Sequence, residues 1–270
     1  MSLDATRLTL ADYRASVEVD AQRLRDAAEG HLELPVPTCP GWSMADLVAH
    51  VGAVYDHKRA AVELGRRPED GEWQRGPAEG EPVLDWCDRM RAGMAAAVYG
   101  GDSSAPAWTF WPAEQTVGFW QRRMAQETVV HRVDAELARE AAGGPPPAPI
   151  GPRLAADGVD EVLGWLAWPW DEDPRPEAAG RTVRVDGRLH AWRVLLEDTS
   201  VTVVGVGVAA AAGGVGSNRP DEADDAYVRG APADLLLHLW GRPVPDGAVV
   251  EGGDPIALTV LKHRLAAVSG

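Results

Sequence analysis

A ten-residue segment rich in proline and glycine divides this sequence into two parts of different character. It runs from Gly143 to Pro152 and reads GGPPPAPIGP. Consecutive prolines cannot continue a helix, and they stiffen the chain into an extended linker. Apolar residues recur with helical periodicity before this segment, whereas short strand-like runs follow it. We therefore expect two domains, a helical one over residues 1–146 and an α+β one over residues 152–270.

The first part contains four patterns typical of amphipathic helices. The second of them follows a Pro40-Gly41-Trp42 turn, and Ser43 with Asp46 three residues later nearly forms a capping box. Connections of about twenty residues, longer than usual bundle turns, are expected near residues 67–81 and 100–117. Together the patterns predict a four-helix bundle. The helices are expected at residues 10–28, from Ser43 to beyond His57, and at residues 82–98 and 118–142.

The second part mixes helical and strand patterns. A hairpin signal, Asp186-Gly187, joins two runs with strand composition, and a third such run follows. The pattern predicts an α+β domain, without internal repeats. The expected helices cover residues 157–168 and 231–240, the strands cover residues 181–185, 191–196 and 201–208, a Gly/Ala-rich loop covers residues 209–217, and residues 256–260 fit either a strand or a helix.

Composition excludes several classes of protein. The chain has 270 residues, 45% of them apolar and 25% charged, as in globular proteins. A net charge of -15 argues against nucleic acid or anionic membrane as partners, since both require basic surfaces. Two cysteines, Cys39 and Cys87, do not suffice for a disulfide framework or a cysteine-built zinc finger.

The sequence also lacks a recognisable secretory signal peptide and a transmembrane segment. Its first twenty residues contain neither a basic nor an apolar signal region, and no apolar run reaches the roughly 18 residues that span a membrane. We therefore expect a cytoplasmic protein. Lysine occurs only at Lys58 and Lys262, while Ala, Gly, Arg and Pro are abundant, a bias typical of GC-rich genomes such as those of actinobacteria.

Glu127 and His131 are the first candidates for chemistry. Their spacing of four residues places both on one helix face, together with Trp120, Met124 and Ala135. An inward-facing carboxylate is costly unless it is paired, protonated or bound to a metal ion. The pair therefore indicates a metal site, a buried Glu–His hydrogen bond or a helix face that is in fact exposed.

His50 is the third candidate ligand, on the apolar face of another helix. If two bundle helices bring it against Glu127 and His131, the set of two histidines and one carboxylate is that of a catalytic zinc site with an open position. The same set suits non-haem iron. Asp134, three residues after His131, is either a fourth ligand or the acceptor that orients this histidine, and we favour the second role. His57 lies about 10 Å further along the helix, too far for the same ion.

Other motifs carry less information. Gly205–Ala210 matches the dinucleotide fingerprint formally, but the following Gly-rich run and Pro220 do not open a helix. Cys39 has no basic group nearby in sequence, so burial is a better explanation for it than nucleophilic use.

Two segments resemble the signature of the mycothiol-dependent maleylpyruvate isomerase family. They are Thr38–Val51, TCPGWSMADLVAHV, and Arg123–Glu136, RMAQETVVHRVDAE; Ala233–Arg242, ADLLLHLWGR, is similar to a looser motif of the same family. The resemblance implies a DinB-like four-helix bundle whose zinc is held by a histidine and an ExxxH pair, here His50, Glu127 and His131. It also implies a smaller C-terminal domain related to sterol carrier proteins.

The resemblance implies an enzyme that uses mycothiol, an actinobacterial low-molecular-weight thiol. We expect zinc or another divalent metal to activate the thiol for addition to an electrophilic small molecule, giving cis–trans isomerisation or S-transfer. Arg242 is the candidate for binding a substrate carboxylate, or else it satisfies the end of a helix. The alternatives are a metal-dependent enzyme of specialised metabolism without a thiol and a non-catalytic ligand-binding protein. A monomer or homodimer is expected.

Overall fold

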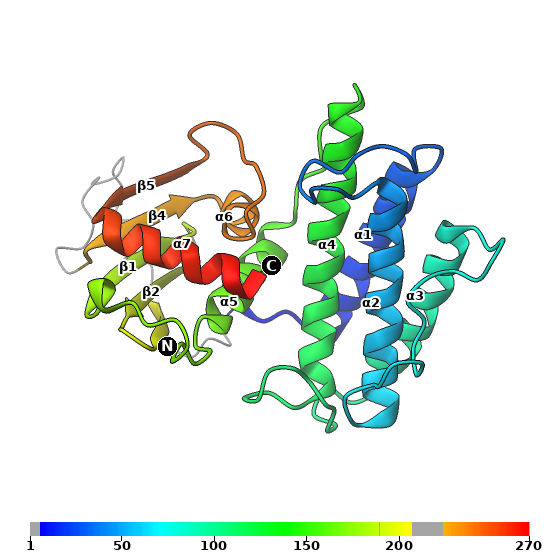
Figure 1. The fold of residues 1–270 in the computed structure, drawn as a ribbon, viewed down its shortest axis with the longest axis horizontal. Helices are drawn as coiled ribbons and strands as arrows, with labels where there is room; N and C mark the ends of the chain where they lie inside the picture. The colour runs from blue at the N-terminus through cyan, green and yellow to red at the C-terminus, as the bar shows by residue number, and fades with distance from the viewer. Residues whose placement is uncertain (1–5, 189, 207–223, 270) are drawn as a thin grey trace. The chain divides into compact units, whose positions relative to one another are not determined.

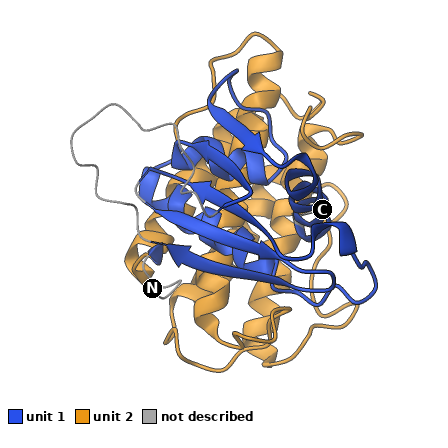
Figure 2. Cartoon of the chain, turned by 90° about the vertical axis from the view of Figure 1, so that its left-hand side faces the viewer, with its two compact units in different colours: residues 1–7, 150–270 blue, residues 8–149 orange. Residues whose placement is uncertain are grey.

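The computed structural model describes residues 6–188, 190–206 and 224–269 (Figure 1), and the chain divides into two compact units (Figure 2). The helical unit comprises Leu8–Pro149. The α+β unit combines the described residues before Leu8 with those from Ile150 onward. The division after Pro149 falls inside the Pro/Gly-rich segment that separates the two sequence patterns.

Four long helices form the helical unit. In this unit α2 packs against α3 and α4, and α1 packs against α4 (Figure 1). The helix α4 lies in the centre of the packing, because nearly all of its side chains from Val117 to Ala135 are buried. The helices are α1 (Leu10–Ala28), α2 (Met44–Leu64), α3 (Val83–Tyr99) and α4 (Val117–Ala141).

Local sequence explains where two of these helices begin. The hydroxyl of Ser43 accepts a hydrogen bond from the backbone N–H of Asp46, and the Asp46 carboxylate accepts one from the Ser43 N–H. The predicted capping box is therefore confirmed. Thr9 and Asp12 form the same box at the start of α1. Each box satisfies backbone donors that a helix N-terminus leaves without a partner.

The two long connections of the helical unit are attached to the helices beside them. Trp86 of α3 donates its indole N–H to the side-chain oxygen of Gln74 at 2.9 Å. Trp120 of α4 donates in the same way to the backbone carbonyl of Trp108 at 2.7 Å. The loop residues are thereby positioned against α3 and α4.

The α+β unit contains a mixed five-stranded sheet and three α-helices in its described residues. The strand order is β3-β2-β1-β4-β5, with β1 and β4 parallel and the other neighbours antiparallel. The elements are α5 (Pro152–Trp165), a short 3-10 helix η2 (Pro176–Ala178), β1 (Arg181–Asp186), β2 (Ala191–Leu196), β3 (Val201–Val206), β4 (Ala226–Gly230), α6 (Pro232–Leu239), β5 (Val249–Gly253) and α7 (Pro255–Ser269).

One face of this sheet carries the core of the α+β unit. Val183, Val185, Trp192 and Val194 share that face and are almost fully buried. The helix α7 packs against β1 and β4, and α6 packs against β4 and β5. Trp192 also donates its indole N–H to Asp160 of α5 at 2.8 Å, so α5 contacts the same core.

The α+β unit differs from the sequence-based expectation in three places. The helix α5 begins at Pro152, because proline fits the first turn of a helix, where its missing N–H is not needed. The strands β4 and β5 were not predicted. The last segment, undecided between strand and helix, forms α7. The predicted hairpin across Asp186-Gly187 is confirmed, whereas residues 207–217 lie outside the described residues.

None of the helices within the described ranges combines the length and apolar character needed to cross a membrane.

Candidate metal centre

The helix α2 presents His50 toward α4. The neighbours of His50 on this helix face, Leu47 and Val51, are almost completely buried, and their packing fixes the rotation of α2. The side chain of His50 itself is 37% exposed, so its imidazole lies at the edge of the core. The ring of Trp42, in the turn before α2, lies 4.9 Å from the His50 ring between centroids. Trp42 therefore limits the orientations that His50 can adopt.

The helix α4 supplies Glu127 and His131. The side chains of these two residues are 12% and 11% exposed, so both polar groups are largely removed from water. Their spacing of one turn brings His131 Nε2 to 3.2 Å from Glu127 Oε1, as the spacing of four residues predicts. The tertiary structure adds His50, whose Nε2 lies 3.4 Å from the same oxygen.

These distances fit a tetrahedral metal ion. With ligand bonds of 2.0–2.1 Å, neighbouring nitrogen and oxygen ligands of tetrahedral zinc lie about 3.3 Å apart. The donor atoms of His50, Glu127 and His131 all lie within 4.8 Å of one another. Two imidazoles and one carboxylate are also ligands that zinc and other first-row divalent metals accept. The three residues could therefore hold a metal ion with little rearrangement.

Two further side chains orient these donors. Asp134, which is fully buried, lies with Oδ2 2.9 Å from His131 Nδ1. A carboxylate at Nδ1 favours the tautomer with a proton on that nitrogen, which leaves the Nε2 lone pair free. Arg123 forms an ion pair with Glu127 Oε2, so that Oε1 faces the histidines. Because Asp134 contacts Nδ1 and Glu127 contacts Nε2, the two carboxylates lie on opposite sides of the His131 ring.

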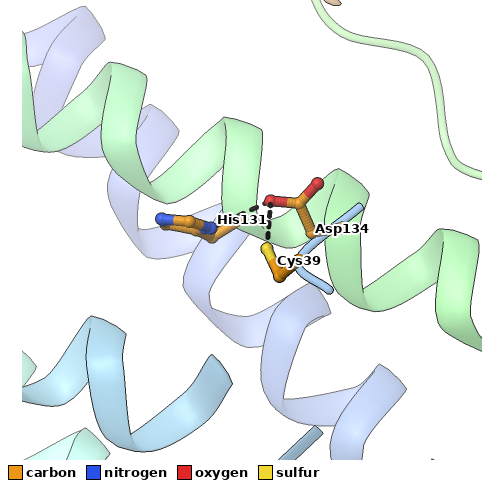
Figure 3. A group of neighbouring side chains, drawn as sticks. All are labelled: Cys39, His131 and Asp134. Atoms are coloured by element: carbon orange, nitrogen blue, oxygen red, sulfur yellow. Dashed lines mark hydrogen bonds and ion pairs between the residues drawn. The ribbon is translucent and has the colours of Figure 1, made fainter. Parts of the chain in front are cut away.

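Cys39 contacts the same carboxylate. Its Sγ donates to Asp134 Oδ2 at 3.9 Å, and Figure 3 shows the thiol and His131 approaching that oxygen from different sides. Cys39, His131 and Asp134 also have metal-ligand chemistry. A neutral imidazole offers one lone pair, however, and a proton shared between Nδ1 and Asp134 leaves that lone pair at Nε2. The set with His50 and Glu127 is therefore the better candidate.

The charges of the site support one another. Burial alone would raise the pKa of Glu127, but Arg123, His131 and His50 hold it well below the usual value. Burial would lower the pKa of His131, but Glu127 and Asp134 raise it to about 9. Glu127 and His131 therefore form an ion pair in the metal-free chain, and a metal ion would displace the His131 proton.

The remaining sequence candidates do not belong to this donor set. His57 contacts Trp73 and Trp108, with ring centroids 4.9 Å and 6.2 Å away, and does not join the donor set. Arg242 lies in the α+β unit just after α6. Its Nη1 donates to the Trp240 carbonyl at 2.8 Å, as expected of a cation at the end of a helix. Binding of a substrate carboxylate by Arg242 stays a prediction.

Sequence reasoning missed three side chains near the cluster. Arg123 stands one turn before Glu127, a spacing that favours an ion pair and could have revealed it. Cys39 reaches Asp134 only through tertiary packing, so no sequence pattern indicated the contact. Lys58 follows His50 by two turns on α2. The rarity of lysine in this sequence was the only feature that could have drawn attention to it.

Fold and site together define a two-domain chain whose helical unit carries a candidate metal centre of two histidines and a glutamate. Residues 13–136 match the family model described as the mycothiol maleylpyruvate isomerase N-terminal domain. The helical unit therefore carries the N-terminal domain that this model describes.

Two solved structures share the fold across both units. The crystal structure of a histidine-to-alanine mutant of the mycothiol-dependent maleylpyruvate isomerase is 12% identical, with a TM-score of 0.59. A second crystal structure of the mycothiol-dependent maleylpyruvate isomerase is 12% identical, with a TM-score of 0.55. Each comparison covers 92% of this chain and 95% of the other. The predicted fold class, a helical N-terminal domain with a smaller α+β domain, is confirmed. A comparison with curated proteins gives no match.

Proposed function

We propose that this chain is a zinc-dependent enzyme that activates a thiol cosubstrate, mycothiol, for reaction with an electrophilic small molecule. The observation that carries the proposal is the convergence of His50 Nε2 and His131 Nε2 on one oxygen of Glu127. The match of residues 13–136 to the mycothiol maleylpyruvate isomerase N-terminal domain supports the choice of mycothiol. The names of the two similar structures support an isomerase.

The geometry favours a catalytic site over a purely structural one. Asp134 contacts Nδ1 of His131, on the far side of the ring from the donor cluster, so it serves as an orienting group and not as a ligand. The set then consists of three protein donors, which leaves a position open for a ligand, as in catalytic zinc sites. Partial exposure of His50 gives that position access to solvent.

The bound metal would supply one piece of chemistry: it lowers the pKa of a coordinated thiol, so that a thiolate is available at neutral pH. The protein residues maintain the arrangement. Asp134 fixes the tautomer of His131, and Arg123 fixes the orientation of Glu127. Because these partners are buried, the donors need little reorganisation when a cosubstrate binds.

Two reactions follow from a nucleophilic sulfur. In the first, sulfur adds to a conjugated carbon–carbon double bond, rotation occurs about the resulting single bond, and elimination restores the double bond and releases the thiolate. The net change is cis–trans isomerisation with no thiol consumed. In the second, sulfur displaces a leaving group, which departs with its electron pair, and the product is a thioether. Arg242 is the predicted residue for binding a substrate carboxylate in either reaction.

The test is turnover of candidate electrophiles by the zinc-loaded chain with and without mycothiol. We expect activity only when both zinc and mycothiol are present. Activity that is unchanged without the thiol would overturn the proposal and favour a metal-dependent enzyme of specialised metabolism. Zinc-edge anomalous scattering from crystals should show His50, Glu127 and His131 around the ion. A closed site with a fourth protein ligand would instead indicate a non-catalytic ligand-binding protein.

A further inference from the structure

The amine of Lys58 lies close to the metal centre. Lys58 follows His50 by eight residues on α2, so both stand on one helix face. Side chains of a helix lean toward its N-terminus, which carries the Lys58 chain back toward His50. The Glu127 carboxylate is near enough to favour the charged form of Lys58, and the Arg123 guanidinium near enough to oppose it. Lys58 therefore faces the same region of the helical unit as the donor cluster.

The Trp120 ring and the His57 imidazole contact this amine, and the Trp108 ring lies near both of them. Lys58 Nζ lies 4.8 Å from the centroid of the Trp120 ring, within the range of a cation–π interaction. The Trp108 ring lies 6.2 Å from Trp120 and 6.2 Å from His57 between centroids. Nζ also lies 3.2 Å from Nδ1 of His57. The amine is thus placed among flat, apolar surfaces with one polar contact.

Within the described residues, Lys58 lacks an acidic partner. Across residues 6–188, 190–206 and 224–269, no carboxylate oxygen lies within 4.0 Å of its Nζ. Two acidic residues on α2 and α4 are engaged elsewhere. Asp56 accepts hydrogen bonds from Arg59 and from the backbone of Gln74, each at 2.7 Å. Glu127 directs one oxygen to the histidines and the other to Arg123.

This arrangement leaves donors of Lys58 available. Burial, together with the cations Lys58, Arg67 and Arg75, lowers the pKa of His57 to about 4. His57 is therefore a neutral acceptor that takes one Lys58 N–H. Burial lowers the pKa of Lys58 to about 8, which still leaves it mostly protonated at pH 7. An ammonium has three donors, so at least one remains for a ligand.

We propose that Lys58, Trp108 and Trp120 form an anion-binding subsite that holds a carboxylate of the electrophilic substrate beside the metal centre. A ligand carboxylate would provide the negative charge that no described residue places within 4.0 Å of this amine. The tryptophan rings would contact the unsaturated carbons attached to that carboxylate. Lys58 is then a residue that determines specificity for acids, and this inference rests on the proposed function of the metal centre.

Binding of fumarate, a flat unsaturated dicarboxylate, tests the subsite. The zinc-loaded full chain is titrated calorimetrically with fumarate and with its uncharged counterpart fumaramide. We expect Lys58→Met to weaken fumarate binding by at least about tenfold, as for loss of a hydrogen bond between charged groups. The matched control Lys262→Met removes the other lysine, which pairs with Glu251 in the α+β unit, and should leave the affinity unchanged. Zinc content should be the same in all three proteins.

Three results would overturn the subsite: no fumarate binding to the wild-type chain, equal affinity in Lys58→Met, or equally tight binding of fumaramide. If Lys58→Met loses zinc or fails to fold, the subsite is tested on the unmutated chain by acylating its lysine amines with and without fumarate. Peptide mapping then measures modification at Lys58 and Lys262 separately. Fumarate should protect Lys58 and not Lys262, and equal protection or none would contradict the proposal. Fumarate binding does not depend on whether the enzyme requires mycothiol. The subsite and the thiol requirement can therefore be disproved independently of each other.

Discussion

The two units use their buried polar groups in different ways. In the α+β unit, Arg264 is fully buried and donates to the backbone carbonyls of Glu197, Asp198 and Ser200. These bonds join α7 to the turn between β2 and β3. In the helical unit, His50, Glu127 and His131 direct their donor atoms toward a common point. A buried charged side chain that bonds to backbone carbonyls stabilises the fold. Side-chain donor atoms that converge on one point indicate instead that a ligand binds there.

Buried charge is not always functional within the helical unit either. Arg132, next to His131 in sequence, is 1% exposed and pairs with Asp20 at 3.1 Å and with Glu136 at 2.6 Å. Its side chain leaves α4 on another face and helps to hold α1 and α4 together. Adjacent residues of one helix therefore have separate roles, because successive side chains point about 100° apart around the axis.

Removing a donor from the convergent set should have the largest effect. The change His131→Ala removes one of three ligands, and we expect the purified chain to lose its zinc on dialysis. The control is His238→Ala, because His238 pairs with Glu251 in the α+β unit and should not affect zinc. Elemental analysis measures the metal. Wild-type zinc content in His131→Ala would show that the ligand assignment is wrong.

Removing the buried cation of the α+β unit should lower stability instead. The change Arg264→Met deletes bonds to three carbonyls, and we expect a loss of about 3 kcal/mol of unfolding free energy. Urea denaturation measures it. Zinc content of the folded protein should stay unchanged. A loss of zinc without a loss of stability would break the distinction drawn between the two units.

A smaller effect is expected from the orienting carboxylate. The change Asp134→Asn keeps the shape of the side chain but weakens its hold on Nδ1 of His131. Loss of such partners typically costs 10- to 100-fold in metal affinity, and we expect about that range here. Competition with a chromophoric chelator measures the affinity. A complete loss of binding would instead favour Asp134 as a ligand.

The smallest effect is expected at Cys39. An S–H donor is weak, and its sulfur lies 3.9 Å from Asp134. The change Cys39→Ala should therefore weaken metal affinity by only about two- to threefold. Cys39→Ser, which keeps a donor, serves as the matched variant in the same chelator assay. A loss as large as that of His131→Ala would show that the alternative set of Cys39, His131 and Asp134 holds the metal.

Sequence-based prediction succeeded where the interactions are local. The helix boundaries of the helical unit follow from apolar periodicity, from the Ser43–Asp46 box and from Gly and Pro residues near the helix ends. The strands β4 and β5 were missed because each has only five residues and ends in glycine, and the alternating burial of β4 arises only in the folded chain. They exist because β1 offers β4 a parallel neighbour, and β4 then offers β5 an antiparallel one. Such pairing depends on residues distant in sequence.

The sequence by itself determined the one-turn spacing of Glu127 and His131, since neighbours on a helix face are fixed by 3.6 residues per turn. Its motifs also indicated the family before any geometry was known. The tertiary structure alone decided that His50 Nε2 reaches the same oxygen as His131 Nε2, and that Lys58 has no acidic partner among the described residues. The physical reason is packing: α2 and α4 are separated by α3 in the chain, and only their buried faces set the distance between these groups.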